Sequence, residues 1–189
     1  MHTKRLGALL ALWLMILLPL PALASALDGR QVEAYLDTLG EVKQLGERMQ
    51  AEGKGALLEQ EIRLGVGTGF DPHQRAVMLL KREHADDYVQ LNRILQPRGF
   101  TSAESWARLG DRVVLAYGAI KAESESPEIL LLAQQMQGMN PQLLQLLPPE
   151  QRVQMEQALV IADALSRVSE ADKQQVRPHI ARLDRVFSQ

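Results

Sequence analysis

The amino-acid sequence predicts an all-α protein, a single-domain irregular bundle of about six to eight helices. Residues that commonly begin helices, such as Ser, Thr, Asp and Pro, recur before apolar stretches along the chain. Within these stretches the apolar residues repeat with the roughly 3.6-residue period of a helix, and strand patterns are absent. The chain has no Cys, so its fold must be held by a hydrophobic core rather than by disulfides.

Residues 1–24 have the composition of a secretory signal peptide. Lys4 and Arg5 precede an apolar run, Leu6 to Leu20, which is too short to cross a bilayer as a helix. Small residues follow, so cleavage is expected after Ala24 or Ala26. We therefore expect the helical domain, residues 27–189, to be periplasmic or secreted, with no stable membrane anchor after processing.

The first two helices are expected at residues 28–49 and 56–64. Asp28 and Gln31 have the spacing of a capping box, and the apolar residues from Val32 to Met49 keep a helical period. The glycine-rich segment 65–69 follows helical sequence and lacks the Lys-Ser/Thr pair of a phosphate-binding loop. We interpret it as a connector.

Two longer helices are expected next. Asp71 before Pro72 predicts a helix start, and the helix should continue to about Leu95. Thr101 and Glu104 have the spacing of a second capping box, which predicts a helix over residues 101–122.

The remaining helices are expected to be shorter or interrupted. The pattern predicts helices over 129–137 and 143–147, with Gly138 and Pro141 between them. A longer helix should follow Pro148-Pro149 and end near residue 168. Ser169 is expected to cap the last region, where Pro178 should begin the final helix.

The segment 98–121 is the most distinctive part of the mature chain. Its larger apolar residues fall on one helical stripe: Trp106, Leu109, Val113, Tyr117 and Ile120. Its small residues leave room for a close neighbour: Gly110, Ala116, Gly118 and Ala119. Both features are expected of a central helix. The segment resembles small, uncharacterised, secreted all-helical proteins of Gram-negative bacteria. The resemblance implies an all-α exported protein and assigns no activity.

Three polar residues are candidates for a site. His84 is expected on the apolar side of its helix, where it would be a buried, hydrogen-bonded residue, a pH-sensitive switch or a ligand contact. Asp111 should point away from the apolar stripe and Arg112 should flank it, as surface or inter-helix ion-pair residues or as part of a site. No metal-ligand motif or cofactor motif is present, so neither a metal nor a cofactor is expected.

The segment 129–147 is uncharged after Ile129 and rich in Leu, Met and Gln. Such a segment forms either ordinary core or a surface that adapts to a partner. The candidate partner-binding residues are Leu131, Met136, Met139, Leu144 and Leu147.

The sequence thus favours an exported, non-catalytic binding or accessory protein that engages another exported protein through this apolar surface. The alternatives are an enzyme with a site around His84 or Asp111 and Arg112, and a carrier of a small apolar ligand. Removal of the leader leaves 19 Lys and Arg against 23 Asp and Glu, so nucleic acid is not an expected partner.

Overall fold

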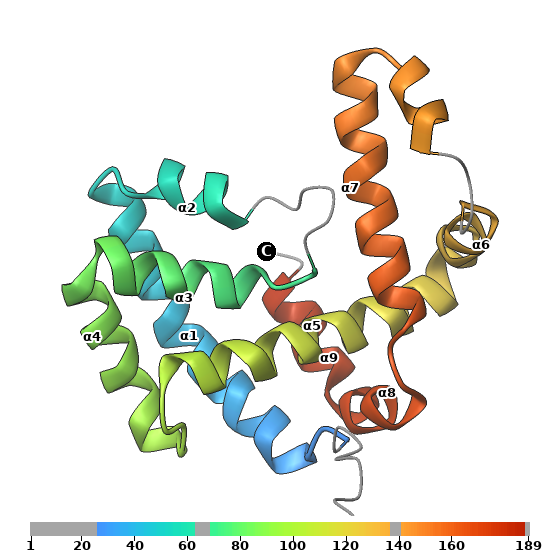
Figure 1. Ribbon diagram of the computed structural model, residues 1–189. Coiled ribbons are helices and arrows are strands. Elements are labelled where there is room, and N and C mark those ends of the chain that lie inside the picture. The colour runs from blue at the N-terminus through green and yellow to red at the C-terminus, as the bar shows by residue number, and fades with distance from the viewer. Residues whose placement is uncertain (1–25, 63–68, 137–140, 188–189) are drawn as a thin grey trace, which may run out of the picture.

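The computed structural model describes residues 26–62, 69–136 and 141–187, and within them every regular element is a helix (Figure 1). The predicted all-α bundle is confirmed. The elements are α1 (Gly29–Ala51), α2 (Gly55–Ile62), α3 (Pro72–Glu83), α4 (Ala85–Leu95), α5 (Ala103–Glu125), α6 (Pro127–Met136), α7 (Pro149–Ser166), α8 (Glu170–Val176) and α9 (Ile180–Phe187), with 3-10 turns η1 (Gln96–Arg98), η2 (Pro141–Leu146) and η3 (Arg177–His179). Among the described helices none combines the length and apolarity needed to cross a membrane.

Helix α5 lies at the centre of the molecule (Figure 1). It contacts α1, α3, α4, α6, α7 and α8. Trp106 and Val113 on the predicted apolar stripe are buried, and so are the small residues Ala107 and Ala119 on other sides of the helix. Helix α5 is therefore enclosed on more than the single face that the stripe predicts.

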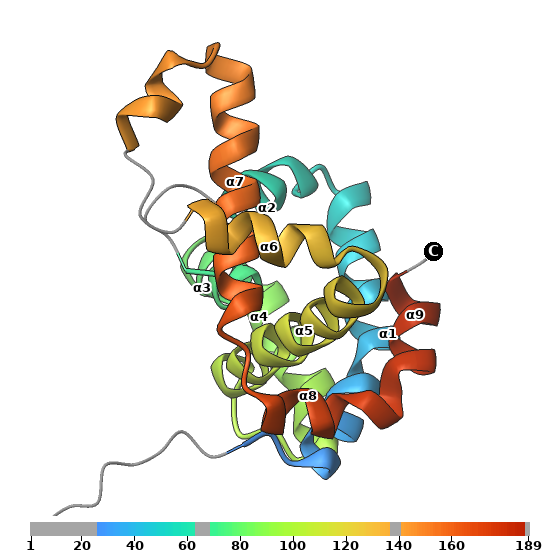
Figure 2. The same cartoon turned by 90° about the vertical axis from the view of Figure 1, so that its right-hand side faces the viewer.

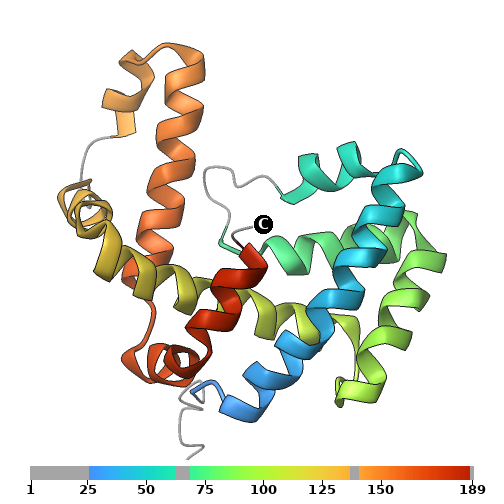
Figure 3. The same cartoon turned by 180° about the vertical axis from the view of Figure 1, so that it is seen from behind.

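The hydrophobic core surrounds α5 and draws on both ends of the described chain. Leu27 precedes α1 and Leu183 lies on α9, and both are buried in the same cluster as Trp106. Figure 3 shows α1 and α9 on the side of α5 that is hidden in Figure 1. The terminal helices thus help to hold α5 in place.

Helix α6, turn η2 and helix α7 form a projection that we call the arm, and we call the other helices the body. Figures 1 and 3 show the outer part of α7 with η2 standing away from the body, and Figure 2 shows α6 packed across α7. Only Ala162 of the 18 residues of α7 is buried. The arm consequently contributes little to the core of the body.

The helix expected over 71–95 is divided at His84. Helix α3 ends at Glu83 and α4 begins at Ala85, with His84 at φ −133° and ψ 62° between them. Leu80 on α3 and Leu91 on α4 both lie in the hydrophobic core, although the chain changes direction between them. Tertiary packing here overrides a continuous helical pattern.

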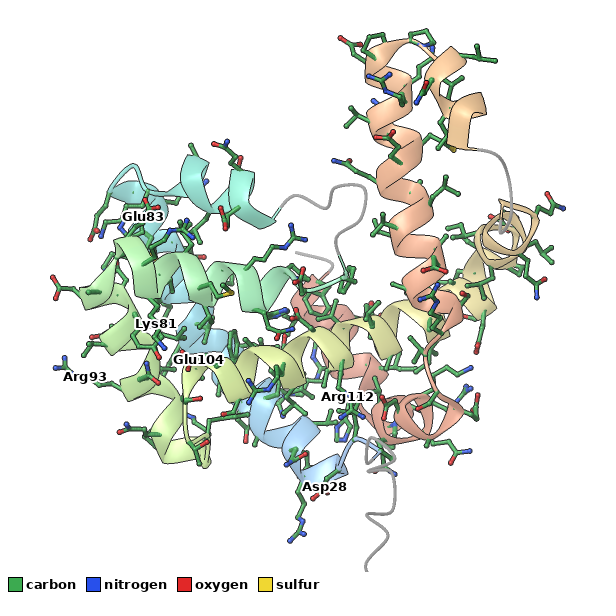
Figure 4. All side chains as sticks on the ribbon, in the orientation of Figure 1. Asp28, Lys81, Glu83, Arg93, Glu104 and Arg112 are labelled. Atoms are coloured by element: carbon green, nitrogen blue, oxygen red, sulfur yellow. The ribbon has the colours of Figure 1, made fainter. Side chains whose placement is uncertain are left out.

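The capping box of α5 is shifted by one residue from the predicted pair. Ser102 accepts a hydrogen bond from the Ser105 backbone N–H (3.1 Å), and Ser105 Oγ accepts one from the Ser102 backbone N–H (3.3 Å). Glu104 instead binds Lys81 Nζ on α3 at 2.7 Å, as Figure 4 allows the reader to follow. The prediction that Thr101 and Glu104 form the capping box was wrong, because the Glu104 carboxylate binds Lys81 of another helix instead.

The C-terminal caps are partly as predicted. Ser169 caps α8 by accepting a hydrogen bond from the Asp172 backbone N–H at 3.1 Å. Pro178, the expected first residue of the last helix, lies inside the turn η3 instead, and α9 begins at Ile180. The short helix expected over 143–147 is the 3-10 turn η2.

Candidate functional site

The most heavily bonded buried charge in the body is the carboxylate of Asp111 on α5. Its side chain is 4% exposed and accepts hydrogen bonds from two residues at the start of α3. His73 donates from its backbone N–H and from Nδ1, both at 2.8 Å, and Gln74 donates from its backbone N–H at 3.3 Å and from Nε2 at 3.0 Å. The first turn of α3 thus supplies all the hydrogen-bond donors that this buried carboxylate needs.

Asp111 therefore serves as the cap of α3, although it lies 40 residues beyond Asp71 in the sequence. The first backbone N–H groups of a helix lack partners within the helix, and a carboxylate satisfies them while it complements the helix dipole. Asp71, the predicted cap, makes no such bond and pairs with Arg75 at 2.8 Å. Asp111 is buried although it points away from the apolar stripe, because the start of α3 covers that side of α5.

A second hydrogen bond extends this contact to α1. An ionised carboxylate only accepts, so His73 Nδ1 carries a proton; in the neutral tautomer that this selects, Nε2 accepts from the Tyr35 hydroxyl at 2.9 Å. Tyr35 is fully buried. Burial first, and then the negative charge of Asp111, raise the pKa of Tyr35 above its ordinary value. The phenol consequently stays protonated and keeps donating.

Trp106 closes the arrangement on the same three helices. Its ring lies 5.3 Å from the His73 ring in an edge-on geometry and 5.7 Å from the Tyr35 ring. Its Nε1 donates to Thr38 Oγ1 at 2.8 Å, and Thr38 in turn donates to the Tyr35 carbonyl at 2.6 Å. We call these residues the Asp111 network: Tyr35, Thr38, His73, Gln74, Trp106 and Asp111.

Gly110 makes room for this network. A Cβ at position 110 would lie 2.8 Å from Tyr35 Cε2 and 3.0 Å from His73 Cδ2. Both neighbours are rings held by hydrogen bonds, so neither can move away cheaply. Only glycine allows the three helices to come this close.

An open apolar groove of about 310 Å³ lies beside the Asp111 network. We call it the α1–α3 groove, because most of its walls come from these two helices. Tyr35, His73 and Trp106 of the Asp111 network line it, and the other lining residues are Leu39, Val42, Leu45, Gly46, Met49, Leu58, Pro72, Ala76, Val77, Leu80, Leu91 and Phe187.

A second hollow, of about 690 Å³, separates the arm from the body. Arg112 on α5 contributes to its wall and binds Asp172 on α8 through Nη2 at 2.9 and 3.0 Å and through Nε at 3.3 Å. Figure 4 labels Arg112 on the part of α5 near α8 and the beginning of α1. Arg112 thus forms an inter-helix ion pair, one of the two roles considered for it.

The structure does not assemble the three polar candidates into one site. Asp111 binds the first turn of α3, whereas His84 follows the last residue of that helix, about 16 Å further along the axis. Arg112 is directed to Asp172 rather than to Asp111. His84 is partly buried, and its Nε2 has no hydrogen-bond partner in the described part of the molecule.

The five candidate partner-binding residues have different positions. Leu131 on α6 is 57% exposed, whereas Leu144 and Leu147 are half-buried. Met136 ends α6, but its side chain lies outside the described part, and Met139 lies outside the described residues altogether. Apolar residues that sequence analysis did not single out are also exposed on the arm: Ile129, Leu146 and Val153.

Sequence analysis missed Tyr35, His73 and Thr38 as members of a network. Their contacts join positions 38 to 68 residues apart, which no local pattern contains. One local signal was available: Ala107, Val114 and Leu115, which lie one turn before and after Asp111 on the same side of α5, are all small or apolar. A carboxylate on such a face must find hydrogen-bond donors inside the protein.

Within the described ranges, His, Asp and Glu side chains nowhere form a group of three that could hold a metal ion. Comparison of the chain with protein-family models, with curated proteins and with solved structures gives no significant match.

Proposed function

We propose that this chain is an exported, non-catalytic accessory protein that binds another exported protein through the apolar side chains of its arm. Export rests on the leader-like residues 1–24. The binding role rests on the arm, and the non-catalytic role on the way the Asp111 network uses its polar groups.

The observation that carries the proposal is the exposure of apolar side chains along the arm. Leu146 is 80% exposed, Leu131 57% and Val153 49%. Further apolar residues of α7 are only half-buried: Met155, Leu159, Val160, Ile161 and Leu165. Several exposed apolar side chains on a projecting segment are typical of surfaces that bind another protein. A partner that presents an apolar segment would bury them.

The Asp111 network supports a scaffolding role for the body. The Asp111 carboxylate accepts from His73 and Gln74, and both ring nitrogens of His73 are engaged. The Tyr35 hydroxyl is buried and donates to His73. An acid, base or nucleophile must reach its substrate, whereas these groups bind one another across three helices. The arrangement fixes α5, which contacts both α6 and α7 of the arm, against α1 and α3.

The test is a set of arm variants in the exported protein. Leu131→Gln and Leu146→Gln should leave the melting temperature within about 2 °C of the parent, because exposed side chains contribute little to stability. Both should abolish co-purification of a crosslinked partner from periplasmic extract. Met78→Gln is the matched control, because Met78 is 60% exposed but lies on α3 of the body. Equal loss of the partner in the control would contradict the proposal.

The α1–α3 groove favours a second candidate function, the carriage of a small apolar ligand. Its volume of about 310 Å³ lies at the lower limit of ligand pockets, and its lining is predominantly apolar. A fluorescent apolar probe should bind the parent and the arm variants equally. Ala76→Phe, which places a ring inside the groove, should abolish binding, and unchanged binding would exclude the groove as the site.

A further inference from the structure

The chain passes from the surface into the core between Ala26 and Leu27. Ala26 is exposed, whereas the Leu27 side chain is 3% exposed and belongs to the hydrophobic core. The Leu27 backbone nitrogen donates a hydrogen bond to Asp172 Oδ1 at 2.8 Å, across 145 residues of sequence. A side chain on α8 therefore holds the first buried residue of the described chain in place.

The Asp172 carboxylate is fixed beside the Leu27 nitrogen by two other contacts. Its carboxylate receives Arg112 from one side, and its backbone N–H is bound by Ser169 at the start of α8. The side chain is 13% exposed, so water screens its charge only weakly. A second cation beside it would be favoured, because a carboxylate has about four lone-pair positions.

Ala26 is also one of the two expected cleavage positions, since Ala24 and Ala26 have the small-x-small spacing that a signal peptidase requires. We infer that the leader is cleaved between Ala26 and Leu27, and that the new Leu27 α-ammonium forms an ion pair with Asp172 that anchors the mature N-terminus. This inference rests on the export that the proposed function includes.

The step changes the nature of the contact. Water adds to the Ala26 carbonyl carbon and the bond to the Leu27 nitrogen breaks. Ala26 leaves with a carboxylate, and Leu27 keeps a protonated amine. A neutral amide donor thus becomes a positive group with three N–H donors, and charge-assisted hydrogen bonds are roughly twice as strong as neutral ones. Cleavage after Ala24 would leave the Leu27 nitrogen an ordinary amide.

The first experiment is N-terminal sequencing of the exported protein. A mature chain that begins at Leu27 supports the inference. An exported chain that begins at Ser25 overturns the inference and leaves the proposed function standing. A chain that keeps its leader and stays in the cytoplasm overturns both, because the proposed function requires export.

The second experiment measures the ion pair by thermal denaturation. A chain that begins at Leu27 should melt about 2–4 °C above a chain that keeps Ser25 and Ala26 before it. Asp172→Asn should remove this difference. Asp37→Asn should preserve it, because Asp37 is an exposed carboxylate that binds Arg182 on the surface. Equal melting temperatures, or a difference that persists in Asp172→Asn, would overturn the inference.

A chemical measurement covers the case in which Asp172→Asn does not fold. Acetylation of the Leu27 amine in the native parent should be at least about tenfold slower than in the urea-unfolded protein, because the amine is held against Asp172. Equal rates would overturn the ion pair without any variant.

Discussion

Replacing Asp111 by Ala tests whether one carboxylate joins α3 to the centre of the fold. The substitution leaves the donors of His73 and Gln74 without their acceptor. His73 and Gln74 are both only partly exposed, so water replaces the lost acceptor incompletely. Each buried donor that loses its partner costs about 1–3 kcal/mol, and a lost helix cap costs a similar amount.

We therefore expect Asp111→Ala to lower the free energy of unfolding by roughly 3–5 kcal/mol. Asp111→Asn keeps one acceptor oxygen but loses the charge, and should cost about half as much. In the control Asp37→Ala, an exposed carboxylate paired with Arg182 is removed, and the cost should stay below about 1 kcal/mol.

Urea denaturation followed by tryptophan fluorescence provides the measurement. The sequence contains two Trp residues, and Trp13 belongs to the predicted leader, so the processed chain would retain only Trp106. Its ring lies 5.3 Å from that of His73, so its emission reports on the Asp111 network directly. A cost below about 1 kcal/mol for Asp111→Ala, or a cost equal to that of Asp37→Ala, would refute the capping role.

Three further outcomes are expected from denaturation experiments. Trp106→Ala should cost roughly 3–5 kcal/mol because it leaves a cavity in the core, and a cost below about 1 kcal/mol would contradict its burial. Gly110→Ala should cost about 1–3 kcal/mol and alter the near-UV circular dichroism, since its Cβ would lie 2.8 Å from a Tyr35 ring carbon; an unchanged spectrum would speak against that contact. The hydrogen bond from Lys81 is the main cause that lowers the pKa of Glu104 from 4.5 to about 2. The stability that Glu104 contributes is therefore present above pH 4.5 and is lost as the pH falls toward about 2, and urea melts of Glu104→Gln should lack this loss.

Helices whose determinants lie within their own segment could be predicted from the sequence. Ser169 caps α8 with its own hydroxyl, and the stripe that contains Trp106 places that side chain in the core. Both follow from the geometry of a single helix, which fixes the face of each residue and the backbone groups left without partners.

Features that depend on a second helix could not be predicted in the same way. Asp71 and Asp111 are both carboxylates able to cap α3, and the choice between them depends on how α5 crosses that helix. The break at His84 likewise depends on where α4 must pack, because the apolar period runs through it without interruption. Of the polar candidates, Asp111 proved to be part of a network whose other members are distant in sequence.

The two ends of the arm lie close together on the body. The chain enters the arm after α5 and leaves it before α8, and Glu123 near the end of α5 pairs with Lys173 and Arg177 beyond the arm. A segment that returns to its point of departure behaves as an insertion, whose length and sequence can change without altering the path of the flanking chain. Residues 127–168 can therefore change in length and sequence while selection on stability acts mainly on the helices around α5.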